Sequence, residues 1–244
     1  MTTPATCFRM ENVQRAFGDA FTLRINHLTV EAGETLTLLG PTGSGKSTLL
    51  RILGGLDHQV TGSTHYRDAS FSHGSLPLGV RRGITLVFQH PQLLNTTVKK
   101  NVEFGLRLRG QQIKADQVQG ILKRLKIEQL QNQPVRSLSG GQIQLTAIAR
   151  ALAVQPSVLL LDEPTSHLDP AHVSLVEEAI QHESASRSMT VVWATHNLFQ
   201  SQRISDRVAF LLDGQLLEVA SPESLFNTPQ DPRTAAFVRG EMVC

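Results

Sequence analysis

The sequence predicts an α/β fold, a mixed β-sheet with flanking helices, on the basis of three observations. Four short apolar runs have the length of buried strands, at residues 35–39, 84–88, 158–161 and 190–194. Each run ends in polar residues, at the position where open α/β sheets bind their ligands. A glycine-rich loop joins the first run to a helix. Together these features predict a ligand site along one edge of the sheet.

Length, charge and cysteine content limit the class of protein. The 244 residues fit one large domain, or one domain with a lobe, and a formal net charge of +2 does not indicate a nucleic-acid or lipid surface. No apolar run approaches the ~20 residues that cross a bilayer, and we see no export signal at the N-terminus. Cys7 and Cys244 are the only cysteines and fit no metal motif, so we expect a reducing cytosol.

The N-terminal segment alternates between apolar and polar residues from 6 to 30, which predicts strands of an antiparallel β part. Residues 15–18 are predicted to form a turn that places Phe17 near the glycine-rich loop. There the ring could stack on a base, an interaction of ~1–3 kcal/mol. Alternatively, Phe17 is a core residue at the edge of the sheet.

The glycine-rich loop has the P-loop pattern, and a strand before it and a helix after it make this a phosphate site. Its glycines allow backbone amides to point inward, and the helix start adds its positive dipole end. Lys46 can bring a full charge to the β- and γ-phosphates, and the Ser47 hydroxyl suits Mg²⁺. The alternative is a glycine-rich turn that contains Lys-Ser by chance. The loop consists of Gly40, Pro41, Thr42, Gly43, Ser44, Gly45, Lys46, Ser47 and Thr48.

Residues 57–83 are polar and predict marginal strands and loops. The next buried strand ends in Gln89, whose amide could reach Mg²⁺ or an attacking water. Four histidines in this half of the chain share no ligand spacing, and we expect them at the surface: His58, His65, His73 and His90.

Helical spacing predicts two helices, at 97–109 and 114–126, that form a lobe beside the sheet. A linker at 132–138 follows, and then a helix over 143–153. Before that helix stands a second anion-binding device, a serine with paired glycines. Two chains arranged head to tail could each offer it to the other's γ-phosphate; without a partner it is a serine-capped helix start. Its residues are Ser139, Gly140, Gly141 and Gln142.

Acidic and basic groups end the last two buried strands. Asp162 could hold the water shell of Mg²⁺, and Glu163 could orient a water for in-line attack. A helix then runs from about 170 to 184. His196 could donate a hydrogen bond to the γ-phosphate, although a satisfied core histidine is the common alternative.

Asp213 and Gly214 predict a hairpin, and two short helices, starting at about 221 and 234, complete the chain.

Taken together, these residues resemble the ATP-binding subunit of an ABC transporter over nearly the whole chain. Leu138–Gln142 is similar to the signature motif of that family. The resemblance implies one domain, 1–244, in which 1–95 and 155–244 form a P-loop NTPase core with its β part and 96–154 form an ABC-type α-helical lobe. It also implies the cofactors ATP and Mg²⁺.

The resemblance assigns each site residue a role. The catalytic residues would be Glu163 as base, His196 as switch histidine, Gln89 and Lys46. Mg²⁺ would be supported by Ser47, Gln89 and Asp162. Nucleotide would contact Phe17 as the adenine-stacking residue, the P-loop Gly40–Thr48, the signature residues Ser139–Gln142, which act on the nucleotide of the second copy, and the D-loop acid Asp169.

The same resemblance implies partners and a location. A second copy would close head to tail around the nucleotide, and integral membrane permease subunits would dock near residues 89–100, at the cytoplasmic face of the inner membrane. A solute-binding protein would act indirectly, and no nucleic acid is expected. The chain departs from the family at Phe17, Leu145, His167 and Asn197. None of these departures removes a residue needed for chemistry, so we predict an active ATPase.

Residues 195–200 and 237–243 look like those of tungstate-type oxyanion importers. The function predicted by resemblance is therefore ATP-driven uptake of tungstate or a related oxyanion. Alternatives are importers or exporters of the phosphate, molybdate, lipoprotein or drug type, and a soluble ABC ATPase acting on nucleic acid or ribosomes. A phosphate-binding regulator without turnover is a further alternative, which Glu163 and His196 argue against.

Overall fold

The computed structural model describes residues 5–57, 59–71 and 76–241. The predictions for His58, His73, Cys244 and the last residues of 237–243 concern positions outside these ranges. Within them, no helix is long and apolar enough to cross a membrane.

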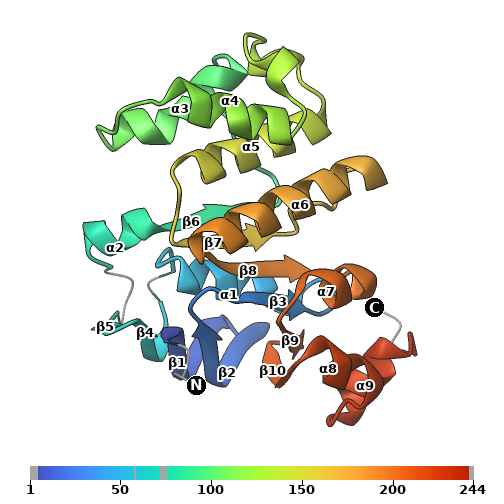
Figure 1. Cartoon of the computed structure of the whole chain (residues 1–244). Coiled ribbons are helices and arrows are strands. Elements are labelled where there is room, and N and C mark those ends of the chain that lie inside the picture. The colour runs from blue at the N-terminus through green and yellow to red at the C-terminus, as the bar shows by residue number, and fades with distance from the viewer. Residues whose placement is uncertain (1–4, 58, 72–75, 242–244) are drawn as a thin grey trace.

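One ten-stranded mixed sheet organises the molecule (Figure 1). Its strand order is β5-β4-β1-β2-β10-β9-β3-β8-β7-β6, which confirms the predicted fold class. The antiparallel part contains β1 (Thr6–Phe17), β2 (Phe21–Glu31), β4 (Thr61–Tyr66) and β5 (Ala69–Ser70). The parallel part contains β3 (Thr35–Leu39), β6 (Ile84–Val87), β7 (Val158–Asp162) and β8 (Thr190–Thr195). Between them lie β9 (Arg207–Leu212), parallel to β3, and β10 (Gln215–Ala220).

The parallel strands are covered on both faces, which explains their unbroken apolar runs. Successive side chains of a strand point to opposite faces. Along β7, Leu159 and Leu161 enter one hydrophobic core, whereas Val158 and Leu160 enter another. The second core also holds the buried face of α1 (Lys46–Leu53), and the first holds residues of α6 (Pro170–Arg187). A single strand therefore serves both cores.

Three helices form a lobe on the far side of α6 from the sheet (Figure 1). They are α3 (Val98–Leu108), α4 (Ala115–Arg124) and α5 (Gly140–Ala153), with short 3₁₀ turns at Glu128–Leu130 and Val135–Ser137. The buried residues of α4 follow the predicted helical spacing. Leu145, which departs from the family pattern, lies fully buried on α5 among the apolar residues of this lobe. Hydrophobic packing therefore anchors this position of the helix.

The remaining helices are α2 (Leu78–Gly83), α7 (Leu198–Ile204), α8 (Pro222–Asn227) and α9 (Pro232–Val238). Each of the last three begins with a side-chain cap, from Asn197, Ser221 and Asp231. These caps satisfy backbone amides that have no partner within the helix.

The largest differences from the prediction concern one turn and three helices. The turn expected at 15–18 lies at 18–20, because β1 continues until Phe17 pairs with Phe21 and Gly18 then adopts a φ of 59°. Helix α2 occupies the end of a stretch predicted as strands and loops. Helix α5 begins at 140 rather than 143, and α6 continues to 187 rather than about 184.

Candidate functional site

A cleft of about 370 Å³ lies where β3, β6, β7 and β8 end. Ten of the sequence-predicted residues contribute to its wall: the base-stacking candidate, six of the P-loop, the glutamine after β6, and the polar residues that end β7 and β8. Phe21 and Arg51 complete the lining. Its residues are Phe17, Phe21, Thr42, Gly43, Gly45, Lys46, Ser47, Thr48, Arg51, Gln89, Glu163 and His196.

Two P-loop positions admit only glycine. A Cβ on Gly40 would collide with the backbone carbonyl of Leu211. Gly45 has a φ of 105°, and a Cβ there would lie 2.8 Å from Leu23 Cδ1. Gly45 is also the N-cap of α1 and provides no side-chain cap. The first amides of α1 are therefore available to an anion in the cleft, with the positive end of the helix dipole behind them.

Lys46 is buried at the base of the cleft. Its Nζ donates hydrogen bonds to the carbonyl oxygens of Gly40, at 2.7 Å, and Pro41, at 2.9 Å. The same Nζ lies 3.7 Å from Glu163 Oε1. The loop's own carbonyls thus fix the direction of this ammonium group, so its charge is directed along the P-loop rather than into solvent.

Ser47 and Asp162 come together from α1 and the end of β7. The Ser47 hydroxyl donates to Asp162 Oδ1 at 2.9 Å. Burial raises the pKa of the Asp162 carboxyl, and the hydrogen bond from Ser47 opposes that shift. A hydroxyl and a carboxylate, with the Gln89 amide in the same cleft, are the oxygen donors that Mg²⁺ prefers.

The raised pKa of Asp162 has a consequence for stability. Folding disfavours the charged carboxylate, so this residue destabilises the protein increasingly as the pH rises through its folded pKa. We expect Asp162→Asn to raise the unfolding temperature at neutral pH by about 1–3 °C without ligand. The gain should shrink as the pH falls toward 3.8, the ordinary pKa of aspartate. Calorimetry across pH, with the exposed Asp116→Asn as control, measures this; a lower unfolding temperature at neutral pH contradicts it.

Glu163 and His196 meet over the cleft from neighbouring strands. His196 Nδ1 lies 2.9 Å from the Glu163 carboxylate. Glu163 has a φ of 47°, uncommon for a residue other than glycine, and its amide donates to the Ala194 carbonyl at 3.1 Å. Left-handed backbone at such a residue is found where the surrounding structure enforces it, often at functional sites. Here β8 holds the strained residue in place.

The signature residues do not line the cleft. Ser139 Oγ accepts from the Gln142 amide at 3.3 Å, and the Gln142 side chain accepts from the Ser139 amide at 3.0 Å, so the two form a capping box on α5. A Cβ on Gly140 would meet nothing, and one on Gly141 would lie 3.3 Å from Leu168. Within this chain, the four predicted residues form the start of α5, with Ser139 and Gly140 exposed and Gly141 and Gln142 half-buried.

Asp169 is likewise outside the cleft. It caps α6, with Oδ1 accepting from the amides of Ala171 and His172 at 3.0 Å each. Its side chain also contacts His172 Nδ1 at 2.5 Å, and this hydrogen bond lowers the pKa of the Asp169 carboxyl. Asp169 therefore presents an exposed carboxylate at the start of α6, and Leu168, the residue before it, lies where a Cβ on Gly141 would come within 3.3 Å of its side chain.

Phe21 and Arg51 were not predicted to belong to the site. Arg51 follows Ser47 by four residues on α1, a spacing that puts both on one face of a helix. Phe21 pairs with Phe17 across the β1–β2 hairpin. The helical spacing of Arg51 is visible in the sequence. The position of Phe21 follows from the β1–β2 pairing register, and that register could not be predicted because the turn was expected three residues too early.

A mixed sheet, a lysine-bearing glycine loop at the start of α1 and a pair of carboxylates at the end of β7 are the features of P-loop nucleoside triphosphatases. Comparison with known proteins identifies the family. The pattern described as ABC transporter matches residues 23–166, and the chain belongs to that family as one of its ATPases.

Curated relatives and solved structures agree. The chain is 38% identical over 252 residues to the phosphate import ATP-binding protein PstB 2 of Natronomonas pharaonis, covering 95% of this chain and 86% of that one. It is 36% identical to the tungstate uptake system ATP-binding protein TupC of Peptoclostridium acidaminophilum, covering 86% and 96%. The ATP-binding cassette MJ0796, solved as a dimer in a post-hydrolysis state with ADP and phosphate, matches with a TM-score of 0.78 at 29% identity, covering 88% and 98%.

Proposed function

We propose that this chain is the ATP-hydrolysing motor subunit of an ABC importer. The observation that carries the proposal is the convergence of Lys46, the Ser47–Asp162 pair and the Glu163–His196 pair on one cleft. The curated relatives named as import proteins support the direction of transport. Reconstitution with its permease in vesicles tests the proposal, since ATP should then drive solute uptake and Glu163→Gln should stop it.

In the proposed mechanism, the P-loop binds the triphosphate. The amides at the start of α1 and the ammonium group of Lys46 contact the phosphate oxygens, while Phe17 stacks on adenine. Ser47, Asp162 and Gln89 would hold Mg²⁺, which neutralises charge on the phosphates when it is bound. Phe17, Lys46, Ser47 and Gln89 line the cleft, and Asp162 is hydrogen-bonded to Ser47.

Glu163 is the proposed general base. Its carboxylate lies within hydrogen-bond distance of His196 and 3.7 Å from the ammonium group of Lys46, so these two neighbours hold it in position. A water in the cleft that donates to this carboxylate would be oriented for attack on the γ-phosphorus. His196 then has two tasks, to hold the base and to donate to a γ-phosphate oxygen.

The signature residues and Asp169 fit a site shared between two copies. Ser139, Gly140 and Asp169 are exposed, and none of these signature residues or Asp169 lines the cleft of its own chain. In a head-to-tail pair, Ser139 and Gly141 of each copy would close over the γ-phosphate held by the other. The dimeric form of MJ0796 supports this arrangement. Solution scattering of Glu163→Gln with ATP tests it, because a chain that stays monomeric under those conditions excludes the shared site.

A second hollow, of about 350 Å³, is the proposed docking site for a permease. It runs between β6 with the segment after it and the helical lobe, and includes Phe88, Gln92 and Phe104. Phe88 and Phe104 are 41% and 40% exposed. The hollow overlaps the predicted docking range of 89–100. Attachment there would hold the chain at the cytoplasmic face of the membrane.

We expect Phe104→Ser to abolish co-purification with the membrane partner while leaving ATP affinity unchanged. The reason is that Phe104 presents apolar surface to the hollow and lies on α3, outside the nucleotide cleft. Affinity purification from detergent-solubilised membranes, with immunoblotting for the permease, measures the loss. Phe199→Ser is the matched control, because Phe199 is 78% exposed on α7 and lines neither hollow. Equal recovery of permease with both variants contradicts this docking site.

Tungstate or a related oxyanion is the proposed solute. The similarity to TupC supports it, and the similarity to PstB 2 makes phosphate the main alternative. Solute choice resides in the permease and a solute-binding protein. The test is ATPase stimulation in the reconstituted transporter by the binding protein loaded with tungstate, molybdate or phosphate. Stimulation by phosphate alone excludes tungstate as the solute.

A further inference from the structure

Phe17, which lines the nucleotide cleft, is contacted by a charged side chain that does not line it. Arg15 lies two residues earlier on β1, so the two side chains share a face of the strand. Arg15 Cζ lies 4.1 Å from the centroid of the Phe17 ring. The guanidinium group therefore covers one face of the Phe17 ring, and it does so from outside the set of residues that line the cleft. On another side, the Phe21 ring is tilted by 45° at a centroid distance of 6.2 Å.

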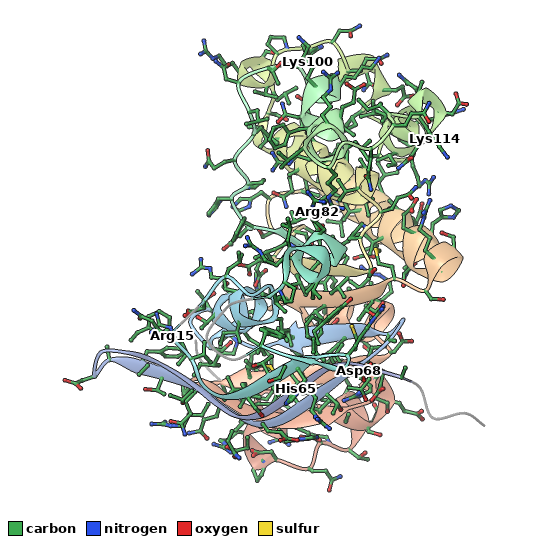
Figure 2. All side chains as sticks on the ribbon, turned by 90° about the vertical axis from the view of Figure 1, so that its left-hand side faces the viewer. Arg15, His65, Asp68, Arg82, Lys100 and Lys114 are labelled. Atoms are coloured by element: carbon green, nitrogen blue, oxygen red, sulfur yellow. The ribbon has the colours of Figure 1, made fainter. Side chains whose placement is uncertain are left out.

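The guanidinium group is itself fixed by an ion pair. Arg15 Nε lies 2.9 and 2.8 Å from the two carboxylate oxygens of Asp57, and a second nitrogen donates to the carbonyl of Ala16. The side chains of Arg15 and Asp57 are only 14% and 13% exposed. Asp57 lies in the segment that follows α1, and Figure 2 shows Arg15 where the projecting hairpin approaches that part of the molecule. The pair thus links the hairpin to the far end of the P-loop helix.

This arrangement restricts the aromatic ring. Phe17 is 40% exposed at the end of a strand, where a phenyl ring has several rotamers available. A cation over the ring face is attracted by the negative π surface, more strongly when it is removed from water. A ring that is already oriented loses less conformational freedom when a flat ligand stacks on its open face.

We propose that Arg15, held by Asp57, is a positioning residue that fixes Phe17 as a one-sided stacking platform for the base of the nucleotide. This inference rests on the proposed function, because it takes ATP as the ligand of the cleft. It implies that Arg15 affects nucleotide affinity only through the contact between Phe17 and the base. The phosphate contacts come from Lys46 and the amides of α1, which Arg15 does not touch.

The test compares a ligand with a base and one without. Calorimetry on the full chain gives the Kd for MgATP and for magnesium tripolyphosphate. Arg15→Ala should weaken ATP binding roughly 3- to 10-fold and leave tripolyphosphate binding within about twofold. Asp57→Asn should cause part of the same loss. The control is Arg9→Ala, on the same strand, whose partner Glu11 is 3.6 Å away in an exposed pair; it should change neither constant.

Making Arg15→Ala in a chain that already carries Phe17→Ala shows whether Arg15 acts by positioning the Phe17 ring or by stabilising the fold. In Phe17→Ala, the further change Arg15→Ala should cost no additional ATP affinity, since the ring that it positions is absent. Unchanged ATP affinity in Arg15→Ala overturns the inference, and so does an equal loss for both ligands. A wild-type chain that binds neither ligand instead contradicts the proposed function. The two failures are therefore distinguishable.

Discussion

Glu163→Gln is expected to abolish ATP turnover while leaving ATP binding intact. Glutamine has nearly the same shape and can still contact His196, which lies 2.9 Å from the carboxylate. It cannot accept a proton from water, and loss of a general base costs roughly 10²- to 10⁴-fold in rate. The nearby carboxylate of Asp162 is engaged by Ser47 at 2.9 Å and is unsuited to replace it. Bound ATP should then persist, and closed dimers should accumulate.

Single-turnover and steady-state assays measure the loss of rate, and size-exclusion chromatography with ATP measures the dimer. Glu178→Gln is the matched control, because Glu178 is exposed on α6 and does not line the cleft. It should behave as the wild type in both measurements. A Glu163→Gln chain that remains monomeric and still hydrolyses ATP contradicts the mechanism.

Lys46→Ala is expected to weaken nucleotide binding roughly 100-fold. The ammonium group lies between the carbonyls of Gly40 and Pro41 and 3.7 Å from Glu163, so its removal leaves the phosphates without their buried cation. Hydrogen bonds to charged groups each contribute about 1.5–3 kcal/mol, which matches a loss of this size. Tripolyphosphate binding should fall by a similar factor, because the lost contact is to phosphate.

Calorimetry with MgATP and with magnesium tripolyphosphate measures both constants. Lys46→Arg tests geometry, since a planar guanidinium group replaces a compact point charge and should restore only part of the affinity. Lys114→Ala, at the N-cap of α4 in the lobe, serves as control. An ATP affinity in Lys46→Ala equal to that of the wild type rules out the P-loop as the phosphate site.

Local patterns account for what the sequence predicted well. The glycine loop, the four buried strands and the polar residues at their ends follow from short-range periodicity and spacing, and the cleft contains Lys46, Glu163 and His196 as expected. Contacts between distant positions could not be predicted in this way. Arg15 pairs with Asp57 across 42 residues, and Glu177 accepts from Gln200 and Arg203 in a largely buried cluster. No spacing rule indicates such partners, since they meet only after the sheet has assembled.

The function of Ser139–Gln142 marks a different limit. The residues and their position at a helix start were predicted, but within one chain they only cap α5. Their proposed contact with a nucleotide requires a second molecule, and under that proposal a single chain would contain half of each site. For these residues, the sequence motif indicates contact with a nucleotide, whereas the geometry of the monomer indicates only a helix cap.

Strand β7 supplies both hydrophobic cores with alternate side chains and ends at Asp162, directly before Glu163. The helices on both faces of the sheet therefore pack against the same strand that carries these two carboxylates. The proposed catalytic carboxylates thus depend for their position on packing in both hydrophobic cores. A motion of the outer lobe large enough to disturb one layer would alter the alignment of the acidic groups without any direct contact with them.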